Sequence, residues 1–154
     1  MNDYMKWKVE TLPDYRIAYM RRIGPYGPAN TQVMEKLKKW AREENLLHHS
    51  TVLLAIPQDN PGITPPESCR FDACIVIPPD IQLDGSISVA EQPGGNYIIN
   101  EVNHTAEHIQ QAYSEIPLSL QSNGYQMDNK PIVERYIGDM NENPFCEICV
   151  PIKE

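Results

Sequence analysis

Alternating apolar and polar positions predict six extended strands in this chain of 154 residues. The predicted strands fall at 15–20, 51–56, 70–77, 97–102, 131–137 and 145–152. Runs of about four to eight such residues, bounded by Gly, Pro, Asn or Asp, are typical of strands. A proline-dense connection joins the second and third runs, and a turn at 138–144 joins the last two.

Two further segments have the period of an amphipathic helix. The apolar stripe of the first helix consists of Val33, Met34, Leu37, Trp40 and Ala41. The weaker stripe of the second consists of Ala106, Ile109, Tyr113 and Ile116. Pro28 suits the first turn of the first helix. Pro117 is expected to end or kink the second helix, and Asn123 with Gly124 forms a turn or helix stop.

The two halves of the chain resemble each other. Residues 9–13 (VETLP) precede one strand, and residues 89–93 (VAEQP) precede a similar strand 80 positions later. Residues 74–78 and 147–151 form a second pair of echoes. We therefore expect two repeats, at about 5–80 and 85–154, packed as one domain spanning 1–154.

The order of the elements predicts an α+β fold. Two pseudo-symmetric strand-helix-strand-strand repeats should form a mostly antiparallel sheet with the helices on one side. We expect a ligand on the other face of the sheet, near the pseudo-two-fold seam.

The charge and composition of the chain limit the kinds of molecule that it is expected to bind. The formal net charge of −8 argues against bare DNA or an anionic membrane, because affinity for phosphates comes from clustered basic residues. The dense basic run, which is interleaved with glutamates and predicts a solvated helix face, consists of Lys36, Lys38, Lys39 and Arg42. The chain has neither an apolar run of about 18 residues nor a signal-peptide core at its start. We expect a cytoplasmic protein with reduced cysteines.

Three other patterns in the sequence resemble metal, catalytic or nucleotide sites. Cys146 and Cys149 have metal-site spacing, but on a strand they would face opposite sides. His104 and His108 lack the glutamate of a metalloprotease motif, and Gly94 with Gly95 precedes a strand instead of a helix. We therefore expect no metal, no cofactor and no catalytic triad.

Six short motifs, in order, resemble the gyrase-inhibitor-like (GyrI-like) small-molecule-binding domain. They are 21–26 (RRIGPY), 59–61 (DNP) with 64–67 (TPPE), 70–74 (RFDAC), 94–97 (GGNY), 131–136 (PIVERY) and 147–152 (EICVPI). This domain is also the effector-binding domain of AraC-type and multidrug-sensing transcription regulators. The resemblance spans nearly the whole chain, which implies a stand-alone form without room for a helix-turn-helix domain.

The resemblance implies a pocket in which a buried glutamate attracts lipophilic cations among aromatic rings. Glu134 matches that glutamate and Glu147 a second acidic group. The aromatic candidates are Tyr113, Tyr136 and Phe71. Family members often have an aromatic pair where this chain has Pro57 and Gln58, and an aromatic residue in place of Cys149. The ligand is therefore expected to be smaller or differently shaped.

Glu134 also stands out without the resemblance, because it lies within an extended run, 132–137, that otherwise has the pattern of a core strand. A carboxylate buried there without a partner costs on the order of several kcal/mol or stays protonated. Strand alternation points Arg135 away from Glu134. The structural alternative is an exposed glutamate, or one salt-bridged to a distant base.

The resemblance, taken with these features, implies three alternative functions. The first is a sensor or sequestering protein that binds hydrophobic, cationic small molecules between the repeats, without a nucleic acid or membrane partner. The second is a protein inhibitor of DNA gyrase, although the scattered acidic residues do not form the concentrated stretch that would support it. The third is a hydrolase of electrophilic cytotoxic small molecules, in which Glu134 would orient or deprotonate water.

Overall fold

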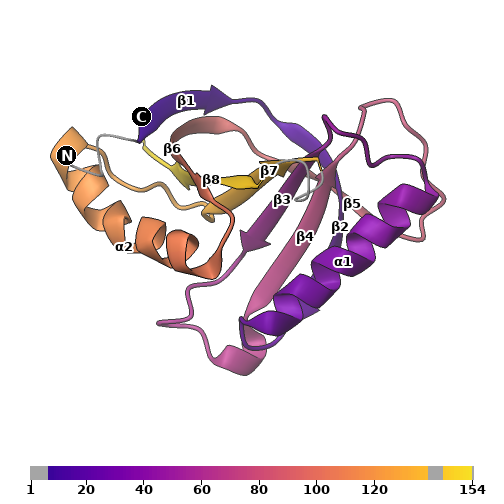
Figure 1. The fold of residues 1–154 in the computed structure, drawn as a ribbon, viewed down its shortest axis with the longest axis horizontal. Coiled ribbons are helices and arrows are strands. Elements are labelled where there is room, and N and C mark those ends of the chain that lie inside the picture. Colours follow the sequence, from indigo (N-terminus) through magenta and orange to yellow (C-terminus); the bar gives the residue numbers. More distant parts are fainter. Residues whose placement is uncertain (1–6, 139–143, 154) are drawn as a thin grey trace.

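One curved antiparallel sheet forms the centre of the molecule, and both helices pack on one of its faces (Figure 1). The structure is a computed structural model that describes residues 7–138 and 144–153. The strands are β1 (Lys8–Leu12), β2 (Tyr15–Ile23), β3 (Val52–Pro57), β4 (Arg70–Val76), β5 (Ser88–Gln92), β6 (Gly95–Asn103), β7 (Val133–Ile137) and β8 (Phe145–Pro151). The helices are α1 (Pro28–Glu43), α2 (Ala106–Asn123) and the short 3-10 helix η2 (Pro66–Ser68). The predicted α+β class is confirmed, and most of the predicted turn at 138–144 lies outside the described residues.

The order of strands reveals the duplication. The sheet runs β1-β6-β8-β7-β3-β4-β2-β5, and each neighbouring pair is antiparallel. From each edge inward, the strands of one half correspond to those of the other. The inner strands β3 and β7 are equivalent and pair with each other, so the pseudo-two-fold axis passes between them.

Each repeat contains one strand more than the alternation predicted, and that strand is exchanged. β1 precedes β2 in the chain but pairs with β6, whereas β5 precedes β6 but pairs with β2. The two registers correspond: Leu12 pairs with Gly95, and Gln92 pairs with Tyr15. Both strands have five residues and are mostly exposed, so their side chains give little apolar alternation.

The register also fixes what lies on the axis. β4 and β8 are both seven residues long, and aligning them end to end makes Cys74 equivalent to Cys149. Cys74 pairs with Leu54 and Cys149 pairs with Val133, so the next residues, Ala55 and Glu134, are equivalent as well. This alignment differs by two residues from the predicted echo of 74–78 in 147–151. Ala55 and Glu134 also pair directly with each other. The carboxyl group of Glu134 therefore lies beside the axis, opposite a methyl group.

Helix α2 does not end at Pro117. Thr105 caps its start, where the Thr105 side chain accepts a hydrogen bond from the His108 backbone N–H, and Gly124, with a φ of 72°, caps its end. Pro117 lies on the exposed side and lacks only its own N–H. The helix persists because buried residues on both sides of the proline, including Ile116 and Ser119, hold it to the sheet. None of the described helices is long and apolar enough to cross a membrane.

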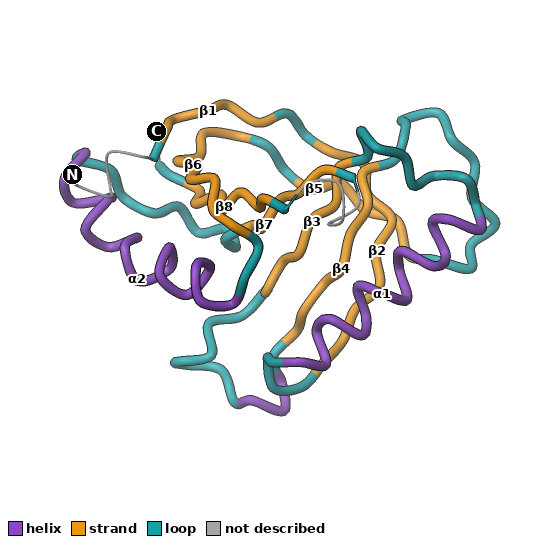
Figure 2. The backbone as a smooth tube through the Cα atoms, in the orientation of Figure 1, coloured by secondary structure: helices purple, strands orange, loops and turns teal. Residues whose placement is uncertain are grey.

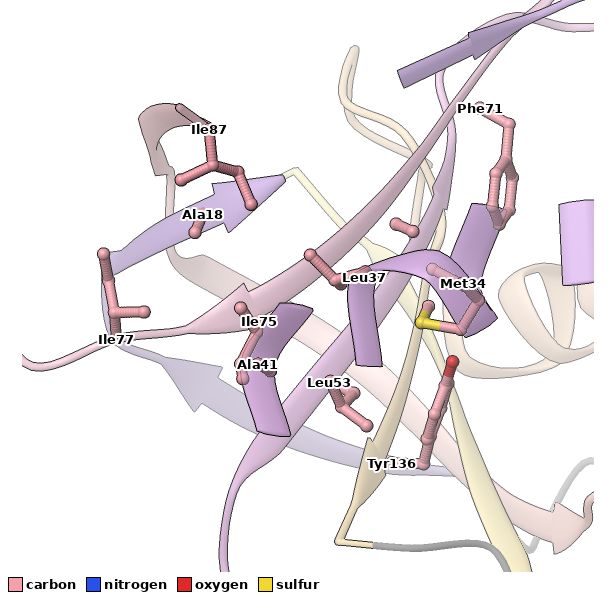
Figure 3. Close-up of a cluster of buried hydrophobic side chains, with 12 residues drawn as sticks. Ala18, Met34, Leu37, Ala41, Leu53, Phe71, Ile75, Ile77, Ile87 and Tyr136 are labelled. Atoms are coloured by element: carbon pink, nitrogen blue, oxygen red, sulfur yellow. The ribbon is translucent and has the colours of Figure 1, made fainter. Parts of the chain in front are cut away.

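Helix α1 packs through its predicted apolar stripe (Figure 3). Met34, Leu37 and Ala41 are buried in one cluster with Leu53 and Ile75 of the sheet. Through these contacts, α1 covers part of the sheet face next to β3 and β4.

Lys38 departs from the predicted solvated face of α1, because only 4% of it is exposed. Its ammonium group lies 5.7 Å from the ring centroid of Tyr136 and 3.6 Å from the Glu35 carboxylate. The aliphatic stem lies within the protein while the charged end keeps aromatic and acidic neighbours.

Candidate functional site

A cavity of about 870 Å³ lies between the two repeats, on the face of the sheet that carries the helices. α1 packs on β2 and β4 and α2 packs on β6 and β8, so the central strands lie between the helices (Figure 1). Glu134 of β7, Phe71 of β4 and Tyr113 of α2 line the cavity. The connections 57–61 and 127–132 complete its walls.

The cavity is therefore on the opposite face from the one predicted. At the seam, the other face is filled by an apolar cluster that includes Leu54, Tyr97 and Val133. The space left there is only about 10 Å³. Sheet curvature closes one face, while the separation of the helices leaves the other open.

The wall at 57–61 belongs to the β3–β4 connection, which projects beyond the sheet (Figure 2). The Asp59 carboxylate accepts bonds from the Arg70 backbone N–H (2.8 Å) and guanidinium (2.9 and 3.0 Å). These Arg70 contacts hold the Asp59 pKa at about 2. The Tyr26 hydroxyl donates to the Arg70 carbonyl (2.7 Å) and accepts from the Asp59 N–H (3.0 Å). The Asp-Asn-Pro motif thus anchors a wall.

The second wall, at 127–132, is tied to two distant segments. The Lys130 ammonium donates to the Gly94 carbonyl (2.9 Å) and lies 3.8 Å from the Asp128 carboxylate. The Asp128 N–H donates to the Pro151 carbonyl (2.9 Å). Hydrogen bonds within the protein therefore hold both walls of the cavity.

Glu134 lies deep in the cavity and has one hydrogen-bond donor among the described residues. The Tyr113 hydroxyl donates to the Glu134 carboxylate over 2.9 Å. Burial raises the pKa of Glu134, and the Tyr113 hydrogen bond opposes this shift. Burial, with the adjacent carboxylate, also raises the pKa of Tyr113, so the phenol keeps its proton and donates.

Glu134 differs in its ion pairing from the other acidic residues that line the cavity. Asp59 pairs with Arg70, and Asp128 pairs with Lys130. Within residues 7–138 and 144–153, no Lys, Arg or His forms an ion pair with Glu134. The cavity therefore contains one acidic group without a basic partner among the described residues.

Three of the five predicted site residues come together at the cavity, namely Glu134, Tyr113 and Phe71. Tyr136 instead belongs to the α1 core cluster, where its hydroxyl end points toward Met34 (Figure 3). Its side chain therefore packs under α1 and not in the cavity.

Glu147 lies on the opposite face, where it bonds to Arg135 over 2.8 Å. Arg135 also contacts Glu10 (3.1 Å) and the Tyr15 hydroxyl (3.2 Å). The prediction that Arg135 points away from Glu134 is confirmed. Glu147 therefore has a structural partner instead of a place in the cavity.

The cysteine pair and the histidine pair that have metal-site spacing do not line the cavity. Cys146 and Cys149 belong to core clusters on opposite faces of the sheet, as the strand alternation predicted. His108 is exposed and bonds to Thr105, whereas His104 is partly buried with its ring centroid 5.1 Å from that of Tyr136. The described part of the chain contains no group of three or more potential metal-binding side chains.

Sequence reasoning missed several wall residues. Tyr26 and Gln58 line the cavity from one side and Lys130 from the other. Gln58 donates to the buried Asp72 carboxylate over 2.9 Å, which fixes its amide. Tyr26 lay within a quoted motif, but Lys130 is brought near the cavity by the fold alone.

Comparison with known proteins identifies the family. A family model for the GyrI-like small molecule binding domain matches residues 5–153. The SPbeta prophage-derived protein YosT of Bacillus subtilis, named as a candidate transcriptional regulator, is 41% identical over 150 residues, 97% of this chain and 100% of YosT. A DNA gyrase inhibitor of Escherichia coli K12 is 24% identical over 148 residues, 94% of this chain and 93% of that protein.

Solved structures share the fold. EcmrR, in a complex with DNA, has a TM-score of 0.75 and 14% identity over 96% of this chain, which spans only 57% of the EcmrR chain. SAV2435, bound to tetraphenylphosphonium, has a TM-score of 0.61 and 17% identity, covering 96% of this chain and 93% of that one. With its family model matched almost end to end and a relative at 41% identity, this chain belongs to the GyrI-like small-molecule-binding domain family.

Proposed function

We propose that this protein binds lipophilic cations in the cavity at the seam, and acts as a sensor or sequestering protein. The observation that carries this proposal is the carboxyl group of Glu134, which has a hydroxyl donor but no ion-pair partner among the described residues. A bound cation would provide that partner.

The shape and lining of the cavity support the same ligand class. Its volume of about 870 Å³ falls within the range of small-molecule sites. Phe71, Tyr26 and Tyr113 offer aromatic surface to an organic cation. The tetraphenylphosphonium bound to SAV2435 is a cation of this type, and the YosT name supports a regulatory setting.

The charge requirement is tested with Glu134→Gln, which retains size and removes the charge. We expect tetraphenylphosphonium to bind the native protein in the micromolar range, about −8 kcal/mol, by isothermal titration calorimetry. The variant should bind about tenfold or more weakly, because a desolvated cation loses its counter-charge.

Glu147→Gln is the matched control, because it makes the same change on the neighbouring strand but on the opposite face. It should lower stability by weakening the Arg135 contact and leave cation affinity unchanged. A pair of ligands, an aryl trimethylammonium ion and its neutral tert-butyl isostere, provides a second control. Equal binding of the two ligands, or equal affinity of native protein and Glu134→Gln, would contradict the proposal.

Inhibition of DNA gyrase and hydrolysis of electrophilic compounds stay predictions. The gyrase inhibitor names belong to relatives of about one-quarter identity. Hydrolysis would use the same carboxyl group.

A further inference from the structure

Among the described residues, the ionisable side chains nearest the Glu134 carboxyl group are neutral. They are the Tyr113 phenol of α2, which donates to the carboxyl group, and the Tyr136 phenol of β7 and the Cys146 thiol of β8, which lie on the same face of the sheet. Opposite Glu134, β3 presents the methyl group of Ala55. Burial raises the pKa of each of these phenols and of the thiol, so all three are neutral at physiological pH.

The described charged side chains farther from Glu134 contact other groups of the protein. On the walls, Asp59 is paired with Arg70 and Asp128 with Lys130. Below α1, Lys38 and His104 both contact the ring of Tyr136 instead of forming an ion pair with Glu134. Burial lowers the pKa of His104, so its ring is neutral near neutral pH.

These surroundings favour the protonated carboxyl group in the empty cavity. A charged carboxylate would have one hydrogen bond, from Tyr113, and no nearby positive charge among the described residues. A ligand with a permanent positive charge reverses this preference, because its charge stabilises the Glu134 carboxylate and not the protonated carboxyl group.

We infer that binding of a permanent cation displaces the proton of Glu134, so that one proton leaves for each cation that enters. The inference rests on the proposed function. In the exchange, the O–H bond of the carboxyl group breaks, its electron pair stays on oxygen, and the proton passes to a buffer base. No oxidant or second substrate is needed.

The exchange separates two kinds of ligand. A quaternary ammonium or phosphonium ion must expel the proton, so acid weakens its binding. A neutral amine can take the proton from Glu134 and become the cation within the site, so it releases none to the solvent. Amine binding should therefore pass through a maximum between the pKa of Glu134 and that of the amine.

The test is calorimetric titration of the native protein with tetraphenylphosphonium from pH 4.5 to pH 8.5, in buffers of different ionisation enthalpy. We expect close to one proton released per cation in the acidic part of the range. Affinity should fall by up to tenfold per pH unit below the midpoint and be constant above it. Glu134→Gln should bind weakly at every pH and release no proton.

Tyr113→Phe distinguishes this exchange from a general effect of pH. Its hydroxyl stabilises the carboxylate, so its loss should move the midpoint of the affinity curve to higher pH. Tyr26→Phe makes the same change at the cavity wall, away from Glu134, and should leave the midpoint in place. Cation binding that requires Glu134 but releases no proton and is constant over the whole range would overturn the inference alone. Absence of cation binding would overturn the proposed function with it.

Discussion

Glu134 destabilises the ligand-free fold at neutral pH, because burial raises the pKa of its carboxyl group above the ordinary value of 4.5. A raised carboxyl pKa gives stability that is complete below the unfolded value and is lost as pH rises through the folded value. Glu134→Gln should therefore match the native protein at acidic pH and exceed it at neutral pH, by on the order of 1 kcal/mol or roughly 2–4 °C in Tm. Thermal melts of the ligand-free proteins over a pH series measure the difference. A variant that is less stable at every pH would show that the carboxylate is a structural group.

The individual residues of the site were predictable to different degrees. A glutamate within an apolar strand pattern indicates Glu134, the motif at 70–74 contains Phe71, and Tyr113 is an aromatic residue of the second predicted helix stripe. The resemblance assigns Glu147 to the pocket by its motif position alone, and that position does not fix the face of the sheet, because a shift of one residue in register moves a side chain to the other face. β7 and β8 pair Glu134 with Ile148, so Glu147 faces away. The length of the intervening turn does not reveal that register.

Among the elements, the wall at 57–61 depends on one carboxylate. The Asp59→Ala substitution should free the Arg70 backbone N–H and loosen the wall, because three hydrogen bonds converge on that carboxylate. Since the Asp59 pKa is about 2, the anchor is present at neutral pH and is lost only as pH falls from 3.8 through that value. Amide hydrogen exchange should accelerate at 59–70 and stay unchanged in β6 and β8.

Asp84→Ala is the matched control for that change. Asp84 also accepts a backbone hydrogen bond in an exposed turn, from Ser86, but it does not line the cavity. Tetraphenylphosphonium affinity should fall several-fold in Asp59→Ala and be unchanged in Asp84→Ala. Equal exchange rates at 59–70 in the two variants would contradict the role given to Asp59.

Sequence patterns located most elements but not their pairing. All six predicted strands and both predicted helices are present. β1 and β5 escaped notice because exposed residues dominate them, with Val9 53% and Val89 42% accessible. Pro117 does not end α2 as expected, because the missing N–H weakens the helix only locally, whereas contacts with the sheet stabilise it along its whole length.

At the scale of the molecule, exchange of the edge strands makes each repeat incomplete by itself. A fragment of residues 1–82 retains β1 but lacks β6, its partner, and a fragment of 83–154 retains β5 but lacks β2. We expect both fragments to be largely unfolded when separate and to form a one-to-one folded complex when mixed. Circular dichroism and native mass spectrometry measure this. A cooperative thermal melt of either fragment alone would contradict it.

The same exchange has a consequence for the growing polypeptide. β1 is made 83 to 91 residues before the positions it pairs with in β6. At about 5–20 residues per second, this interval corresponds to a wait of about 4–18 s on the ribosome. During that time an unpaired strand edge is open to pairing with other nascent chains. Lys8 and Glu10 place charges of both signs on this short strand, and such charges disfavour premature pairing until β6 is synthesised.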